Sequence, residues 1–98
     1  MRALEYFGAA LYHAKRRELD FAIFFAELSN YPQASELAEI CRAQRELCRD
    51  FKIKACEYGK RKWYRRAARN FAAALEINVQ DEIARRGLIC TAGRGFIL

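Results

Sequence analysis

Apolar residues recur at intervals of three and four along almost the whole chain, which is the period of an α-helix with one buried face. The pattern predicts five helices, at residues 2–14, 18–28, 33–59, 63–77 and 80–91. No segment alternates apolar and polar residues between turn residues, so no strand is predicted. The expected fold is therefore all-α, with successive helices packed as antiparallel hairpins.

The clearest break in the pattern lies at residues 29–32, where Pro32 cannot donate a hydrogen bond inside a helix. Asn30 followed three residues later by Gln33 resembles a capping box, which marks a helix start. No breaker follows until Gly59, so the third segment is predicted to be one helix of about seven turns. Gly59 is its expected stop, because glycine suits the left-handed conformation that ends many helices.

The helical pattern becomes weaker toward the C-terminus. Asn78 and Asp81 predict the start of a short last helix, since an acidic residue in the first turn complements the helix dipole. Gly87 lowers the helix propensity of this segment. Residues 93–98 are expected to form a flexible tail.

The second half of the chain places small and aromatic residues at a defined spacing. These residues are Phe51, Ala55, Tyr58, Ala67, Phe71 and Ala74. Their order resembles that of a tetratricopeptide repeat, which implies two antiparallel helices that form one unit. Two positions depart from the family pattern, with Lys54 in place of leucine and Val79 in place of proline.

Residues 1–32 resemble a weaker copy of this repeat, 47 residues earlier. The matching residues are Leu4, Phe7, Gly8, Leu11, Phe24 and Pro32. Asp20 and Glu27 stand where the family has small alanines, and a carboxylate at a close helix crossing needs a partner or solvent. The family repeats about every 34 residues. The longer spacing here implies an extended first helix in the second pair.

The resemblance implies a hairpin at residues 1–32, a long-helix hairpin at residues 33–79 and a capping helix at residues 80–92. An unrelated helical bundle is the alternative fold. In the family, the first helix of each pair lines a groove that binds peptides or helices of partner proteins. The residues implied to lie on or near this groove are Arg49, Lys52, Cys56 and Lys60.

The composition fits one folded domain. The 98 residues suffice for a single modest core. Hydrophobic residues make up 53% of the chain and aromatic residues 13%, which excludes an intrinsically disordered segment.

The positive charge is concentrated in one segment. The net charge is +6, and Lys52–Arg69 contains eight basic residues against the single acidic residue Glu57. This basic segment predicts an acidic partner. The candidate partner-binding residues are Arg49, Lys52, Lys60, Arg61, Lys62, Trp63, Arg65, Arg66 and Arg69.

The sequence therefore predicts a non-catalytic protein-protein interaction module that acts as an adaptor or scaffold, an assembly or secretion-type chaperone, or a subunit of a larger complex. An acidic segment or helix of another protein is the expected partner. Nucleic-acid binding through the basic and aromatic residues 52–69 is the alternative. A third reading is a solvated basic face whose stems pack on Trp63 and Tyr64. The apolar composition also favours self-association.

The sequence offers no candidate active site. Its single histidine, His13, has no nucleophile placed beside it by the pattern. No phosphate-binding glycine loop and no metal-ligand spacing occur. Catalysis, a metal and a cofactor are therefore not expected.

Three of the four cysteines, Cys41, Cys48 and Cys56, fall on the predicted long helix. At seven and eight residues apart they are separated by about 10 Å, too far for a disulfide. With Cys90 they are interpreted as buried free thiols, which indicates a reducing, intracellular compartment. Neither a membrane span nor a signal peptide is predicted. The cytoplasm is the expected location, and the amphipathic basic N-terminus makes the mitochondrion the alternative.

Overall fold

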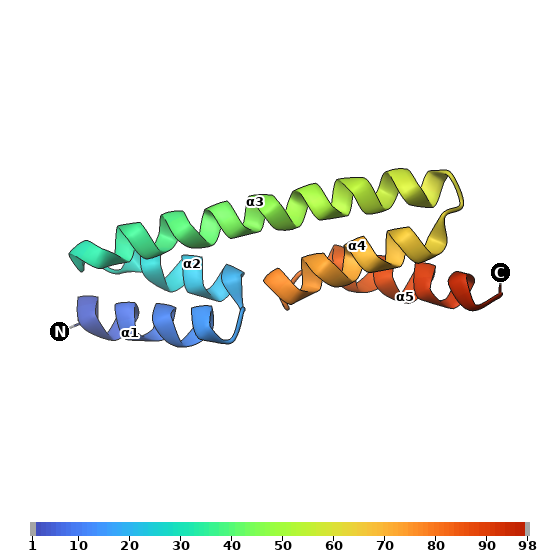
Figure 1. Cartoon of the computed structure of the whole chain (residues 1–98). Coiled ribbons are helices and arrows are strands. Elements are labelled where there is room, and N and C mark those ends of the chain that lie inside the picture. Colours follow the sequence, from blue (N-terminus) through green and yellow to red (C-terminus); the bar gives the residue numbers. More distant parts are fainter. Residues whose placement is uncertain (1, 98) are drawn as a thin grey trace.

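The structure is a computed structural model that describes residues 2–97, with side chains described for residues 2–94. Its five helices are α1 (Arg2–Lys15), α2 (Leu19–Leu28), α3 (Pro32–Lys60), α4 (Tyr64–Ile77) and α5 (Glu82–Ile97) (Figure 1). No strand occurs among the described residues, so the all-α prediction is confirmed. The predicted long helix is continuous over its whole range.

α3 forms one long edge of the molecule, and the other four helices lie along it as two hairpins (Figure 1). α1 and α2 pack along its N-terminal half, whereas α4 and α5 pack along its C-terminal half. In the second half, α4 packs on both α3 and α5, which touch each other only slightly. The molecule is consequently elongated, with extents of 56 × 17 × 14 Å.

The start of α3 differs in detail from the prediction. The helix begins at Pro32, whose fixed φ and missing N–H suit the first helical position. Tyr31 precedes it and makes no side-chain cap. The predicted capping box of Asn30 and Gln33 is therefore wrong.

The last helix begins later and ends later than predicted. Asp81 caps α5, because its carboxylate accepts a hydrogen bond from the amide of Ala84 (3.0 Å). α5 then continues to Ile97, so the predicted flexible tail is wrong for residues 93–97, while Leu98 lies outside the described residues. Glycine lowers helix propensity by about 1 kcal/mol but does not block the helix.

The turn of the first hairpin is a Schellman motif. The amide of Glu18 donates to the carbonyl of His13 (2.9 Å), and the amide of Arg17 donates to the carbonyl of Ala14 (3.0 Å). These two bonds satisfy carbonyls at the end of α1. They require a left-handed residue after the helix, which here is Arg17 with a φ of 60°.

The turn between α3 and α4 repeats these bonds 45 residues later. The amide of Trp63 donates to the carbonyl of Tyr58 (2.9 Å), and that of Lys62 to the carbonyl of Gly59 (3.0 Å). Lys62 is the left-handed residue, with a φ of 63°. The long helix therefore ends at Lys60, and the prediction of Gly59 as its stop is wrong because the left-handed position comes three residues later.

The same 45-residue shift relates buried small residues of the α1–α2 pair to those of the α3–α4 pair. Ala10 corresponds to Ala55 and Ala22 corresponds to Ala67, and all four are completely buried. These alanines allow the close helix approach within each hairpin. The predicted spacing of 47 residues is therefore wrong by two residues.

Asp20 and Glu27 do not stand at close helix crossings, contrary to the prediction. Both are exposed, and they lie 3.5 Å from Arg45 and 2.9 Å from Arg42 of α3, respectively. The prediction failed because it took Phe24 as the buried aromatic residue of the first hairpin. Phe24 is in fact 57% exposed.

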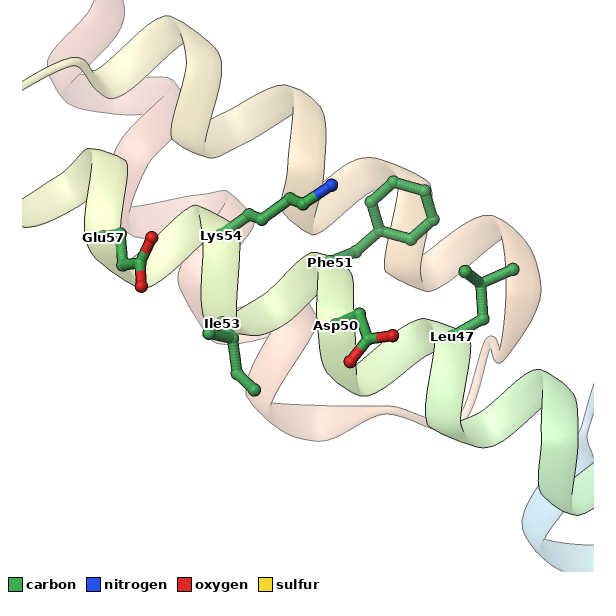
Figure 2. A pocket seen from close by; sticks show the side chains of 6 residues that line it. All are labelled: Leu47, Asp50, Phe51, Ile53, Lys54 and Glu57. Carbon is green, nitrogen blue, oxygen red and sulfur yellow. The ribbon is translucent and has the colours of Figure 1, made fainter.

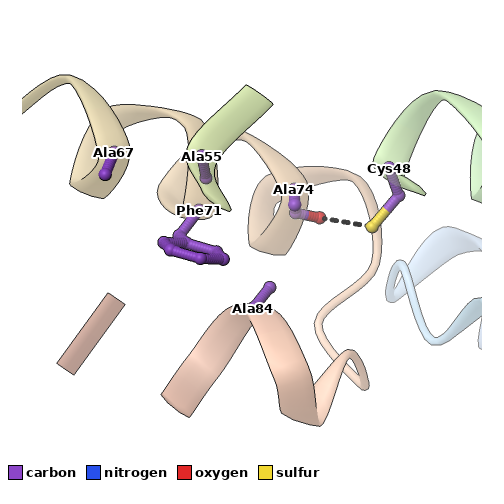
Figure 3. Packing of buried hydrophobic residues seen from close by; sticks show 6 residues of the cluster. All are labelled: Cys48, Ala55, Ala67, Phe71, Ala74 and Ala84. Atoms are coloured by element: carbon purple, nitrogen blue, oxygen red, sulfur yellow. Dashed lines mark hydrogen bonds between the residues drawn. The ribbon is translucent and has the colours of Figure 1, made fainter. Parts of the chain in front are cut away.

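Small side chains dominate the core of the second half. Its largest cluster consists of Cys48, Ala55, Ala67, Phe71, Ala74 and Ala84 (Figure 3). The sulfur of Cys48 lies 3.4 Å from the carbonyl oxygen of Ala74 across the α3–α4 contact. Phe71 is the only large residue of this set, so it fills the space between the three helices.

Two of the four cysteines are buried and two are exposed. Cys41 and Cys48 lie seven residues apart on α3, so they share its buried face. The eight residues from Cys48 to Cys56 rotate the next thiol by about 80°, which moves it out of the core. The prediction of four buried thiols is therefore wrong for Cys56 and Cys90, which are exposed.

The two hairpins meet where the α1–α2 turn contacts the α4–α5 turn. The amide of Val79 donates to the carbonyl of Arg17 (2.9 Å). The guanidinium of Arg17 donates in turn to the carbonyl of Glu76, 59 positions away (3.2 Å). These bonds tie the end of α4 to the start of α2 beneath the middle of α3.

Candidate functional site

A groove of about 480 Å³ lies between α3 and α5, and we call it the α3–α5 groove. The residues that line it are Arg49, Lys52, Ile53, Cys56, Glu57, Lys60 and Ile83. All four α3 residues that the sequence placed on the groove side are among them. The spacing of three, four and seven residues explains this, because such residues share one face of a helix.

Apolar side chains form the middle of the α3–α5 groove. Ile53 is 47% exposed and Ile83 of α5 is 65% exposed, values that are high for isoleucine in a folded domain. Cys56 is exposed between them in the same groove. The groove therefore offers apolar area to a partner.

Lys52 is held by an internal ion pair. Its ammonium lies 2.6 Å from the carboxylate of Asp81, which is only 8% exposed. The thiol of Cys48 donates to the same carboxylate oxygen (3.2 Å). Lys52 thus joins α3 to the start of α5, and its charge is largely neutralised within the chain.

Burial governs the ionisation of this cluster. Burial, with the hydrogen bond to Asp81, raises the pKa of Cys48 to about 12, so the thiol keeps its proton and acts as a donor. Burial alone would raise the pKa of Asp81. Hydrogen bonds from Lys52, the amide of Ala84 and Cys48 outweigh that effect and lower the pKa of Asp81. The carboxylate is therefore ionised over the neutral range.

Arg49 and Lys60 supply the remaining positive charge of the groove. Arg49 lies 3.8 Å from Glu46, but both side chains are about two-thirds exposed, and such a pair is weak. Lys60 forms no ion pair with the described residues. Both cations are therefore available to an acidic partner.

The α3–α4 turn forms a second basic region around one indole ring. The guanidinium carbons of Arg61 and Arg66 lie 5.2 and 5.1 Å from the centre of the Trp63 ring. Tyr58 stacks on the same ring at 5.9 Å. This stack reinforces the turn, because a contact between these two positions commonly accompanies the Schellman motif. Lys62, at the left-handed position, is exposed.

Arg65, Arg66 and Arg69 form the α4 arginine face. All three are exposed, and they lie opposite the buried residues Ala67 and Phe71 on the helix. Since α4 packs on both α3 and α5, this face points away from the α3–α5 groove. The nine predicted residues therefore do not form one surface.

A shallow hollow of about 400 Å³ on the outer side of α3 was missed by sequence reasoning. Figure 2 shows Asp50, Ile53 and Glu57 on one side of α3, with Phe51 and Lys54 directed toward α4. Groove and hollow are similar in size, so volume does not distinguish them. The two differ in charge, because two carboxylates and only one amine line the hollow.

The carboxylates of the hollow belong to a longer row along α3, which we call the α3 acidic stripe. Its members are Glu36, Glu39, Glu46, Asp50 and Glu57, and all are exposed. Their separations of three, four and seven residues place them on one side of the helix. This spacing is visible in the sequence.

Among the described residues, no helix is both long and apolar enough to cross a membrane. Within the same part of the chain, no group of three histidine, cysteine or acidic residues is placed to hold a metal ion. No protein-family model matches the sequence, and no curated protein or solved structure matches it either.

Proposed function

We propose that the chain is a non-catalytic binding module that holds an acidic segment or helix of a partner protein in the α3–α5 groove. It serves as an adaptor, an assembly chaperone or a subunit of a larger complex. The observation that supports this proposal best is the arrangement of charge and apolar area in the groove. Two available cations flank a row of exposed apolar side chains.

The dimensions of the groove define the preferred ligand. Arg49 and Lys60 lie eleven residues apart on α3, which is about 16 Å along the helix axis. An extended peptide of about five residues spans that length. We therefore expect a segment with an acidic residue at each end and apolar residues between them, as suits Ile53 and Ile83.

The proposed architecture is a divergent pair of tetratricopeptide-like hairpins. Two Schellman turns at the same relative position and alanines at the close helix contacts support this proposal. The spacing of 45 residues exceeds the family's usual 34, because α3 is longer than a family helix. A groove between α3 and α5 agrees with the place where such arrays bind partners.

Nucleic-acid binding has weaker support. Single-stranded nucleic acids stack their bases on free aromatic faces. Arg61 and Arg66 already lie over the ring of Trp63, and Tyr58 stacks on it. The most exposed aromatic residue of the basic region is therefore occupied within the chain itself.

A photo-crosslinker on Cys56 tests the proposal directly. In a Cys90→Ser variant, Cys56 is the only exposed thiol, since Cys41 and Cys48 are buried. Crosslinking in a native extract should label a partner within an acidic and apolar segment. Substituting Arg49→Glu and Lys60→Glu should abolish the crosslink, because both flanking cations are reversed.

The matched control reverses two charges outside the groove, in an Arg65→Glu/Arg69→Glu variant. This control should retain the crosslink. If the groove variant crosslinks as well as the parent while the control loses the crosslink, the groove is not the binding site. If nuclease treatment of the extract removes the crosslinked species, the partner is a nucleic acid and the proposal is wrong.

A further inference from the structure

We propose that a second copy of this chain docks its α4 arginine face on the α3 acidic stripe of the first. This inference uses the carboxylates on the outer side of α3 and the arginines of α4, not the cations of the α3–α5 groove. Ile53 and Glu57 line both the groove and the hollow, and the variants that test the inference change neither residue. It rests on the charge and spacing of two opposite faces. Among the described residues, only one member of the two faces, Glu46, has a partner of opposite charge within ion-pair distance.

The carboxylates of the stripe are almost all free of ion pairs in the described part of the chain. Glu46 alone has a cation within reach, Arg49 at 3.8 Å. Asp50 and Glu57 stand beside the exposed apolar side chain of Ile53 in the hollow of Figure 2. A guanidinium can pair with these carboxylates while its aliphatic stem covers the isoleucine.

The arginines of α4 form the complementary surface. Arg65 and Arg69 have no carboxylate within ion-pair distance among the described residues. They lie four residues apart, as do Glu46 and Asp50, so both pairs are separated by about 6 Å along their helices. The two rows can therefore meet in register.

The two faces lie on opposite sides of the molecule. Cys48 and Ala55 of α3 face α4 in the core, whereas Asp50 and Glu57 lie on the other side of α3. One pair of molecules can consequently form only one such contact. A contact between unlike faces leaves a free face on each molecule of the pair, so association continues beyond the dimer to a closed ring or an open filament.

Sedimentation velocity of the full chain at several concentrations tests this proposal. At about 0.02 M salt the weight-average mass should rise with concentration beyond twice the 11.4 kDa of the monomer. At about 0.5 M salt the mass should fall back, since exposed charges are then screened. A chain that stays monomeric at low salt overturns the proposal and leaves the stripe to a basic partner of another kind. A mass that stops at the dimer also overturns it.

Two charge-reversal variants identify the faces. The stripe variant is Glu46→Arg/Asp50→Arg, and the arginine variant is Arg65→Glu/Arg69→Glu. Each variant alone should remain monomeric, because like charges then meet at the contact. A control with the same change in net charge as the arginine variant, Arg2→Glu/Lys15→Glu on α1, should associate like the parent.

An equimolar mixture of the two variants is the decisive sample. In the mixture, the native arginines of the stripe variant can meet the native carboxylates of the arginine variant. The arginines introduced in the stripe variant can likewise meet the glutamates introduced in the arginine variant, so both kinds of contact join opposite charges. Association should therefore return, although both variants carry a net positive charge and repel each other overall. Circular dichroism confirms that each variant is folded before mixing. Failure of folded variants to associate on mixing, or association of either variant alone, contradicts the proposed pairing.

Discussion

The backbone amide of Leu19 donates a hydrogen bond to the side chain of Asn78, which lies 59 positions later in the chain (3.2 Å). The amide of Phe21 donates likewise to the side chain of Gln80 (3.0 Å). The residue before α2, Glu18, makes no cap because its carboxylate contacts His13. The first turn of α2 is therefore capped by the other hairpin, which couples the two halves of the molecule.

Asn78→Ala should lower the free energy of unfolding by about 1–3 kcal/mol, because it leaves the buried amide of Leu19 without an acceptor. The side chain of Asn78 is only 2% exposed, so water cannot replace it fully. Urea unfolding followed by circular dichroism measures the change. Asn70→Ala is the matched control, since the amide of Asn70 bonds only within its own helix. If both alanine variants unfold at the same urea concentration, the cap contributes nothing.

Asp81 should make the fold sensitive to acid. Its pKa is lowered in the folded state, so its contribution to stability is present above its unfolded pKa of about 3.9 and is lost as pH falls through the folded value. When the pH falls below about 5, the free energy of unfolding of the Asp81→Asn variant should therefore decrease less than that of the parent. Unfolding free energies measured from neutral to acidic pH provide the comparison.

Glu82→Gln is the control for this pH dependence, because Glu82 is exposed at the next position. It should retain the acid sensitivity of the parent. An Asp81→Asn variant with an unchanged pH profile would show that the buried carboxylate is not the source.

Gly87→Ala should destabilise the protein by about 1–3 kcal/mol through overpacking. An added Cβ at Gly87 would clash with the ring of Phe71, which is enclosed in the core of the second half. Gly8→Ala in α1 meets no atom within 4 Å and should instead stabilise its helix by up to about 1 kcal/mol. Thermal unfolding of the two variants should shift in opposite directions, and equal shifts would contradict the packing at Phe71.

Lys62→Gly should stabilise the fold by about 0.5–1 kcal/mol, because Lys62 adopts a left-handed backbone that glycine accepts without a Cβ clash. Lys60→Gly makes the same chemical change at the last residue of α3 and should destabilise by up to about 1 kcal/mol, because glycine has a low helix propensity. Chemical unfolding distinguishes them. Stabilisation by both substitutions, or by neither, would contradict the assigned turn.

The positions of the first four helices could be predicted to within one residue, because each buried face shows a clear three-and-four period. The groove side of α3 was implied by the resemblance to tetratricopeptide repeats. Both ends of α5 and the left-handed turn residues were predicted less well. The left-handed turns at Arg17 and Lys62 lack the glycine that usually marks them.

Relationships between distant segments could not be predicted from spacing alone. Asp20 looked like a misplaced core residue, yet it is an exposed partner of Arg45. Lys52 looked like a free cation, yet it is paired with Asp81. In both cases the partner lies on another helix, so only the packed structure reveals the interaction.

Because α3 is unbroken, no linker separates the two halves of the molecule. Residues 32–47 complete the core of one hairpin and residues 48–60 complete that of the other, so a cut within α3 would leave each fragment with an open apolar face. Neither fragment is then expected to persist alone, whereas the two together could reassemble. The hairpins resemble separable repeats, but because both pack on α3 we expect them to unfold as a single cooperative unit.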